Sequence, residues 1–217
     1  MAPKYHLVYF DIRGRAEPIR ILFALAGASY TEERVHPSEW PALKTSGRCP
    51  FGQVPVLELG DGKSLCQSTV ILKYVANQLG FSPSDNYAKA QAEVFVDSIK
   101  DFQNALQRLA REKAADPKDE KKSSLYDAEI ANTLEFIDKL LQQNNGGKGY
   151  LVGDKISFAD VCFFSVFNDY LVGGELKVPE QLKKHPLLVD LYNRVMNEPK
   201  ILEYLKKRKP NPDWYSF

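Results

Sequence analysis

The hydrophobic pattern of this chain changes once, near residue 80. Before that point, short apolar and β-branched runs alternate with stretches of helical spacing, and after it only helical spacing occurs. The predicted strands cover residues 5–10, 30–35, 55–59 and 64–66. The predicted helices cover residues 15–26 and 68–79, with a short helical connection near 40–44. This order predicts a mixed four-stranded sheet with one parallel crossover and one terminal hairpin.

From residue 87 onward the pattern predicts helices alone. An apolar stripe at alternating steps of four and three indicates one long amphipathic helix, which Pro117 breaks. Ser157-Phe158-Ala159-Asp160 has the form of a capping box, with Asp in place of the usual Glu or Gln, and it opens a buried helix. We therefore expect an α+β domain over residues 1–80, a turn-rich linker over 81–86 and an all-helical domain over 87–217.

The composition limits the classes of function and partner. A formal net charge of +1 over 217 residues gives no reason to expect nucleic acid or an anionic membrane as a partner. The N-terminus has no apolar signal region and no stretch approaches the ~20 apolar residues of a membrane span, so we expect a cytoplasmic protein. Three widely spaced cysteines favour free thiols, and no Cys/His spacing resembles a metal site, so we expect no metal.

Four short strings, in their order and spacing, resemble those of the cytosolic glutathione transferases. They lie at residues 5–17, 50–57, 67–68 and 157–160. The resemblance spans nearly the whole chain and is closest to the sigma class, which includes glutathione-dependent prostaglandin D synthases. It implies a thioredoxin-like first domain, a homodimer, and conjugation of glutathione, the co-substrate, to small hydrophobic electrophiles in detoxification. A thioredoxin-like redox protein is disfavoured because the chain has no Cys-x-x-Cys.

Conjugation requires the glutathione sulfur as a thiolate. A free thiol has a pKa near 8.5, so lowering it by about two units requires roughly 2.7 kcal/mol of preferential stabilisation of the anion. One well-placed neutral donor with local dipoles can supply this. Between Met1 and Gly27 the only side-chain hydroxyls belong to Tyr5 and Tyr9, and the matched string selects Tyr9 as the catalytic donor. The alternative is a core tyrosine with a satisfied hydroxyl.

The resemblance implies that Arg15 lies near the sulfur and adds its charge; otherwise it is a surface cation at a helix start. It also implies a cis Val54–Pro55 bond that turns the backbone of Val54 toward the cysteinyl part of glutathione. At the next helix start, Gln67 and Ser68 would receive the γ-glutamyl carboxylate, with a plain N-cap as the alternative for Ser68.

The glycine end of glutathione is expected to be held by Trp40, Lys44 and Gln53, although Trp40 could simply be a packing residue. Asp101, in the long helix, resembles the aspartate that reaches the γ-glutamyl ammonium in the partner subunit's site; a solvated helix charge is the alternative. Phe51 is a candidate for the subunit interface or the core.

The second substrate is expected to lie in a pocket formed by Phe10, Ile12, Arg15 and Leu106. The aromatic tail over residues 211–217 could cap this pocket or pack on the surface, and the sequence does not decide between these alternatives. Two other functions remain open: a dedicated prostaglandin D synthase that uses the same thiolate, and a non-catalytic relative such as a lens S-crystallin.

Overall fold

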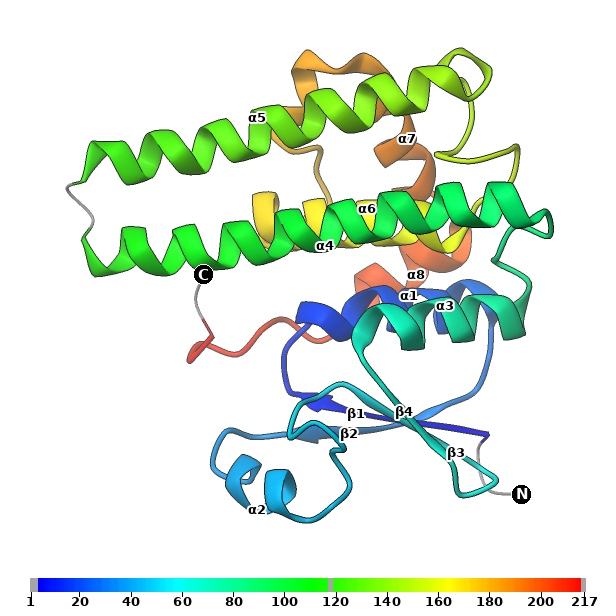
Figure 1. The fold of residues 1–217 in the computed structure, drawn as a ribbon, viewed down its shortest axis with the longest axis vertical. Helices are drawn as coiled ribbons and strands as arrows, with labels where there is room; N and C mark the ends of the chain where they lie inside the picture. The colour runs from blue at the N-terminus through cyan, green and yellow to red at the C-terminus, as the bar shows by residue number, and fades with distance from the viewer. Residues whose placement is uncertain (1–3, 117–118, 216–217) are drawn as a thin grey trace. The chain divides into compact units, whose positions relative to one another are not determined.

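The computed structural model describes residues 4–116 and 119–215, and its backbone divides into two compact units (Figure 1). One unit comprises the described residues up to Ser82 together with those from Pro199 onward. The other runs from Pro83 to Glu198. The first unit contains a four-stranded sheet with helices and the second is all helical, which confirms the predicted fold class.

The sheet of the first unit has the strand order β2-β1-β3-β4. Its strands are β1 (Tyr5–Phe10), β2 (Thr31–Val35), β3 (Val56–Leu59) and β4 (Ser64–Cys66). β1 is parallel to β2 and antiparallel to β3, and β4 closes the sheet as the antiparallel partner of β3. The central position of β1 explains its nearly continuous apolar run, because a strand covered on both faces need not alternate. The mixed sheet and its terminal hairpin are as predicted.

Three helices complete the N-terminal part of this unit: α1 (Glu17–Ala26), α2 (Trp40–Thr45) and α3 (Ser68–Leu79). A 3-10 turn, η1 (Gly14–Ala16), leads into α1, and Gly27 ends that helix in the left-handed conformation, as expected for a glycine stop. α1 packs on α3, and Figure 1 shows both helices on one side of the sheet with α2 on the other.

The last helix, α8 (Pro199–Lys207), packs on α1 within the first unit. The sequence analysis had assigned this segment to the helical domain. Glu17 of α1 makes the attachment, because its Oε1 accepts hydrogen bonds from the Tyr204 hydroxyl at 3.1 Å and from Arg208 Nη1 at 2.8 Å. The tail beyond α8 also lies on this unit, where the Trp214 ring meets His36 edge to face, with centroids 6.0 Å apart. Residues 216–217 of the tail lie outside the described part of the chain.

The helical unit is built on two long helices, α4 (Asn86–Ala115) and α5 (Glu120–Gln143), with α6 (Phe158–Val172) and α7 (Pro186–Met196). Two short 3-10 segments, η2 (Asn145–Gly147) and η3 (Glu180–Lys184), lie in the connections. The predicted stripe of α4 is buried, and α4 packs on both α5 and α6. Pro117, which was expected to break the first long helix, lies outside the described residues.

α6 is the most buried helix of this unit, and the predicted capping box starts it. The Asp160 carboxylate accepts the backbone N–H of Ser157 at 2.8 Å and that of Leu151 at 2.7 Å. Ser157 Oγ in turn accepts the N–H of Ala159 at 3.3 Å. The box is confirmed, and its Asp also fixes the preceding loop through Leu151. Among the helices described, none has the length and apolar character needed to cross a bilayer.

Candidate active site

The strand register brings three predicted glutathione-binding segments to one end of the sheet. Val8 of β1 is paired with Val56 of β3, and Val56 is paired with Cys66 of β4. The residues directly beyond this row are Tyr9, Pro55 and Gln67. Because neighbouring strands lie about 4.8 Å apart, residues separated by more than forty positions in sequence become neighbours here.

Tyr9 lies in β1 with a side chain that is only 6% exposed. Its hydroxyl oxygen accepts the backbone N–H of Arg15 at 3.1 Å. Gly14 approaches the same oxygen so closely that a Cβ at this position would lie 2.8 Å from it. A hydroxyl that accepts an N–H is polarised, which strengthens its own O–H as a donor. The geometry therefore suits a phenol that donates a hydrogen bond to an anion.

The side of the site formed by α2 rests on a small apolar core. Phe10 and Trp40 pack edge to face with ring centroids 5.2 Å apart, and Trp40 is half-buried. Both rings cover a cluster formed by Val8, Val35, Leu43, Cys49 and Val56. Lys44 is exposed, and its Cε lies 3.2 Å from the position a Cβ would take at Gly52, so its chain runs beside the residue that precedes Gln53.

The Val54–Pro55 peptide is cis, as the resemblance implied. At the entrance to α3, the expectation that Ser68 is the N-cap is wrong: Ser68 is the first helical residue and Gln67 occupies the N-cap position. Gln67 has φ 72°, which non-glycine residues rarely adopt, and its side chain makes no capping hydrogen bond. One residue in this conformation carries the chain from the last residue of β4 into the helix. The first N–H groups of α3 consequently start at the end of the sheet next to Pro55.

The predicted site residues divide between the two units. Ile12 is buried, and Phe10 and Arg15 are half-buried, all on or next to the loop that follows β1. Asp101 and Leu106 belong to α4 of the helical unit, where Asp101 is exposed and Leu106 is fully buried. The first unit thus contains every predicted site residue except these two.

The sequence analysis did not identify three residues that shape the site: Gly14, Arg20 and Asn211. Arg20 is fully buried, and Asn211 Oδ1 accepts the backbone N–H of Arg13 at 2.8 Å. A signal for Arg20 was present, since it stands between two isoleucines in an otherwise apolar helix, three residues after Glu17. Asn211 carried no such signal, because its partner is far away in sequence.

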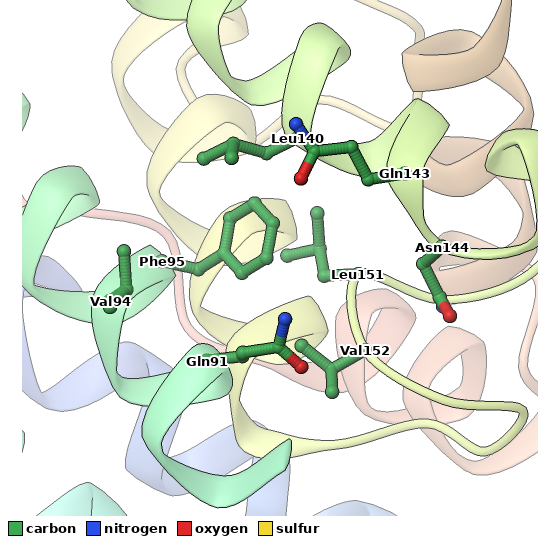
Figure 2. Close-up of a pocket in the computed structure, with 8 residues that line it drawn as sticks. All are labelled: Gln91, Val94, Phe95, Leu140, Gln143, Asn144, Leu151 and Val152. Carbon is green, nitrogen blue, oxygen red and sulfur yellow. The ribbon is translucent and has the colours of Figure 1, made fainter. Parts of the chain in front are cut away.

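A separate pocket of about 210 Å³ lies within the helical unit (Figure 2). Its apolar lining consists of Val94, Phe95, Leu140, Leu151 and Val152. Its polar lining consists of the amides Gln91, Gln143 and Asn144. Figure 2 shows the Phe95 ring and the Leu151 side chain next to one another at the centre of this lining. The pocket includes none of the residues predicted to bind glutathione. Within the described residues, no group of three or more His, Cys, Asp or Glu is arranged to hold a metal ion.

Comparison with known proteins decides the family. Residues 5–77 match the model of the glutathione S-transferase N-terminal domain, and residues 100–208 match that of the glutathione S-transferase C-terminal domain. The chain is a member of the glutathione S-transferase family. The family uses glutathione as co-substrate, and the first unit of this chain has the thioredoxin-like fold.

The relatives of this glutathione S-transferase include other glutathione S-transferases and S-crystallins. It is 32% identical to glutathione S-transferase 1 of Ascaris suum, with 97% of this chain and 99% of the relative covered. It is also 32% identical to S-crystallin 4 of Enteroctopus dofleini, with 95% and 97% covered.

Solved structures of the family superpose over almost the full length. A monomeric glutathione S-transferase from the hookworm Necator americanus has a TM-score of 0.82 at 32% identity, with 94% of this chain and 97% of that chain covered. A Nu-class glutathione S-transferase from Haemonchus contortus has a TM-score of 0.79 at 31% identity, with 94% and 97% covered. A prostaglandin synthase D of Nilaparvata lugens has a TM-score of 0.75 at 29% identity, with 95% and 100% covered.

Proposed function

We propose that this transferase is a cytoplasmic, sigma-type enzyme that conjugates the thiolate of glutathione to small hydrophobic electrophiles, with Tyr9 as the donor to sulfur. The observation that carries the proposal is the hydroxyl of Tyr9, which accepts the Arg15 N–H at 3.1 Å beside the ends of β3 and β4. The backbone of Arg15 therefore helps to orient this hydroxyl.

The thiolate requires about 2.7 kcal/mol of preferential stabilisation to lower the thiol pKa by about two units. A hydrogen bond from a neutral donor to an anion contributes roughly 1.5–3 kcal/mol, which is most of this amount. The half-buried guanidinium of Arg15 supplies the remainder as a positive charge near the sulfur. Tyr9 and Arg15 are accordingly the proposed catalytic residues.

Glutathione would lie along the same end of the sheet. Its γ-glutamyl carboxylate would meet the N-terminal N–H groups of α3 at Gln67 and Ser68, where the helix dipole favours an anion. The backbone of Val54, before the cis bond to Pro55, would pair with the cysteinyl part. The exposed ammonium of Lys44, with Trp40 and Gln53, would hold the glycine end.

The electrophile would bind over Phe10, Ile12 and Arg15. Leu106 was also expected to line this pocket, but its side chain is fully buried in the helical unit, so it is not proposed as a contact. In the proposed division of roles, the first unit binds glutathione and the helical unit, from Pro83 to Glu198, takes part in binding the electrophile. The similarity to the prostaglandin synthase D of Nilaparvata lugens supports the sigma class.

We further propose a homodimer in which Asp101 of one subunit reaches the γ-glutamyl ammonium bound to the other. Asp101 and Asp97 are both exposed and lie one turn apart on α4, so both carboxylates belong to the solvent-exposed face of that helix. Phe51 is 69% exposed, which rules out the core position and favours the interface alternative.

The test of the Tyr9 assignment is Tyr9→Phe, which removes one oxygen. We expect the variant to stay folded and to bind glutathione, while kcat/KM for a chloronitrobenzene substrate falls about 10²-fold. Calorimetry of glutathione binding and circular dichroism are the controls. Unchanged turnover in the variant would refute the role of Tyr9.

Two relatives point to other functions, which turnover measurements with two substrates separate. The similarity to S-crystallin 4 favours a non-catalytic protein, and a wild-type chain that binds glutathione without turnover would support that alternative. The similarity to the prostaglandin synthase favours an isomerase, which would convert an endoperoxide with far higher kcat/KM than any aromatic halide.

A further inference from the structure

The loop between β1 and α1 determines where the Tyr9 hydroxyl points. Its Arg15 N–H donates to that oxygen, and its Gly14 backbone passes directly against it. A displacement of this loop by a few tenths of an ångström would therefore lengthen the hydrogen bond from the Arg15 N–H to the phenol oxygen.

Arg20 of α1 holds this loop from within the protein. Its Nη1 donates to the carbonyl oxygens of Ile12 at 2.9 Å and of Arg13 at 3.0 Å. Its guanidinium carbon also lies 5.8 Å from the centroid of the Tyr9 ring. One fully buried side chain thus contacts both the catalytic ring and the loop that orients its hydroxyl.

The charge of Arg20 is neutralised by two carboxylates, Glu17 at 3.1 Å and Glu32 at 2.5 Å. Such a buried ion pair is weak evidence for a contribution to stability, because its desolvation offsets its Coulomb attraction. A guanidinium is, however, a rigid planar fork that fixes several acceptors at once, which a lysine ammonium on a flexible stem does not do. The arrangement is therefore suited to holding backbone in position.

Asn211 holds the same loop from the C-terminal segment. Its Oδ1 accepts the Arg13 N–H at 2.8 Å, so the amide of Arg13 is bound by Asn211 and the carbonyl by Arg20. Both polar backbone groups of Arg13, the residue that precedes Gly14, are consequently anchored.

We propose that Arg20 and Asn211 are positioning residues that hold the loop over residues 12–15 so that the Tyr9 O–H is directed at the glutathione sulfur. This inference rests on the proposed function of Tyr9. It assigns to the segment after α8 a role in thiolate formation rather than only in packing.

The experiment measures the pKa of the enzyme-bound glutathione thiol, from the pH dependence of the thiolate ultraviolet absorbance, in Arg20→Lys and Asn211→Ala. Each substitution should raise this pKa by about half a pH unit or more, which is a roughly threefold decrease in the acid dissociation constant of the bound thiol. Glutathione affinity should change little, because neither side chain is proposed to contact glutathione. Asn211→Ala removes only one hydrogen bond, from a half-buried residue. It therefore tests whether anchoring of this loop affects the thiol pKa even if Arg20→Lys folds poorly.

Tyr204→Phe is the matched control. It removes a hydrogen bond to Glu17 in the same buried network without touching the contacts from Arg20 to Ile12 and Arg13. We expect it to lower stability and to leave the bound-thiol pKa at the wild-type value.

The results distinguish the positioning roles of Arg20 and Asn211 from the proposed function of Tyr9. A wild-type pKa for the bound thiol in both folded variants, with a raised pKa in Tyr9→Phe, would overturn the positioning roles and leave the proposed function intact. A wild-type protein whose bound thiol titrates like free glutathione would overturn both.

Discussion

At the scale of single residues, Gly14 is the position with the least tolerance near the site. Its φ of +45° lies in the left-handed region, and the Tyr9 hydroxyl occupies the space that a Cβ would need. A side chain at this position would strain the backbone and, as a separate effect, displace the phenol of Tyr9. The two effects can be distinguished because Gly62, in the β3–β4 turn, has φ +83° and open space around it.

We predict that Gly14→Ala and Gly62→Ala each lower the free energy of unfolding by about 1–2 kcal/mol, because both place a Cβ at positive φ. Only Gly14→Ala should also lower kcat/KM, by about 10- to 100-fold, since it displaces the catalytic hydroxyl. Urea unfolding and steady-state kinetics provide the two readouts. Equal activity in the two variants would show that the close approach to Tyr9 has no catalytic consequence.

At the scale of elements, two attachments shape the fold: α8 on α1 through Glu17, and the start of α6 through Asp160. Both carboxylates are buried, with 1% and 0% exposure, so each depends on its hydrogen-bond partners. The two differ in the partners they use. Glu17 is surrounded by cations from α1 and from the end of α8, whereas Asp160 accepts N–H groups.

The Glu17 attachment should weaken in acid. Burial alone would raise the pKa of Glu17, but Arg20 and Arg208 outweigh it and hold the pKa below its ordinary value of 4.5. A depressed pKa contributes stability that is fully present above 4.5 and is lost as the pH falls toward the folded-state value. We predict that the stability of the wild-type protein declines more steeply below this pH than that of Glu17→Gln. Urea unfolding at a series of acidic pH values tests this, and parallel slopes would contradict it.

The capping box should contribute more than a surface carboxylate. Asp160→Ala leaves the N–H groups of Leu151 and Ser157 without their acceptor, so we predict a loss of about 2–4 kcal/mol in the free energy of unfolding. Asp154→Ala, at an exposed aspartate in the same loop, should cost less than about 0.5 kcal/mol. Similar losses in the two variants would mean that the box does not stabilise the helix start.

At the scale of the whole molecule, the remaining question is whether each site is complete in one subunit. The family includes the monomeric enzyme from Necator americanus, so a dimer does not follow from membership alone. Asp101 is proposed to bind the glutathione held by the other subunit. Phe51 is proposed to hold the two subunits together.

We predict that Asp101→Ala raises the Kd for glutathione about 3- to 10-fold while the protein remains dimeric, because it removes one charged partner of the ammonium. Phe51→Ala should yield monomers with a similarly raised Kd. Leu176→Ala, at another exposed apolar residue that is 44% accessible, is the control and should change neither quantity. Light scattering and calorimetry give the two readouts. A wild-type protein that is monomeric and still binds glutathione tightly would exclude any contribution of a partner subunit to the glutathione site.

Much of this protein was determined by the sequence alone, namely the features that depend on residues close together in the chain. The strands, the helix stop at Gly27 and the capping box at Ser157 follow from periodicity and local hydrogen bonding over a few positions. The proposal of thiolate chemistry, with Tyr9 as the donor, also rests on local strings and their resemblance to a family.

Only the tertiary structure decided the features that join distant residues. Tyr204 binds Glu17 across 187 positions, and Asn211 binds Arg13 across 198. No local pattern encodes such pairs, because the residues around one partner carry no information about which distant residue it will contact. The positive φ of Gln67 belongs to this group as well, since the strand before it and the helix after it impose that conformation on a residue that does not prefer it.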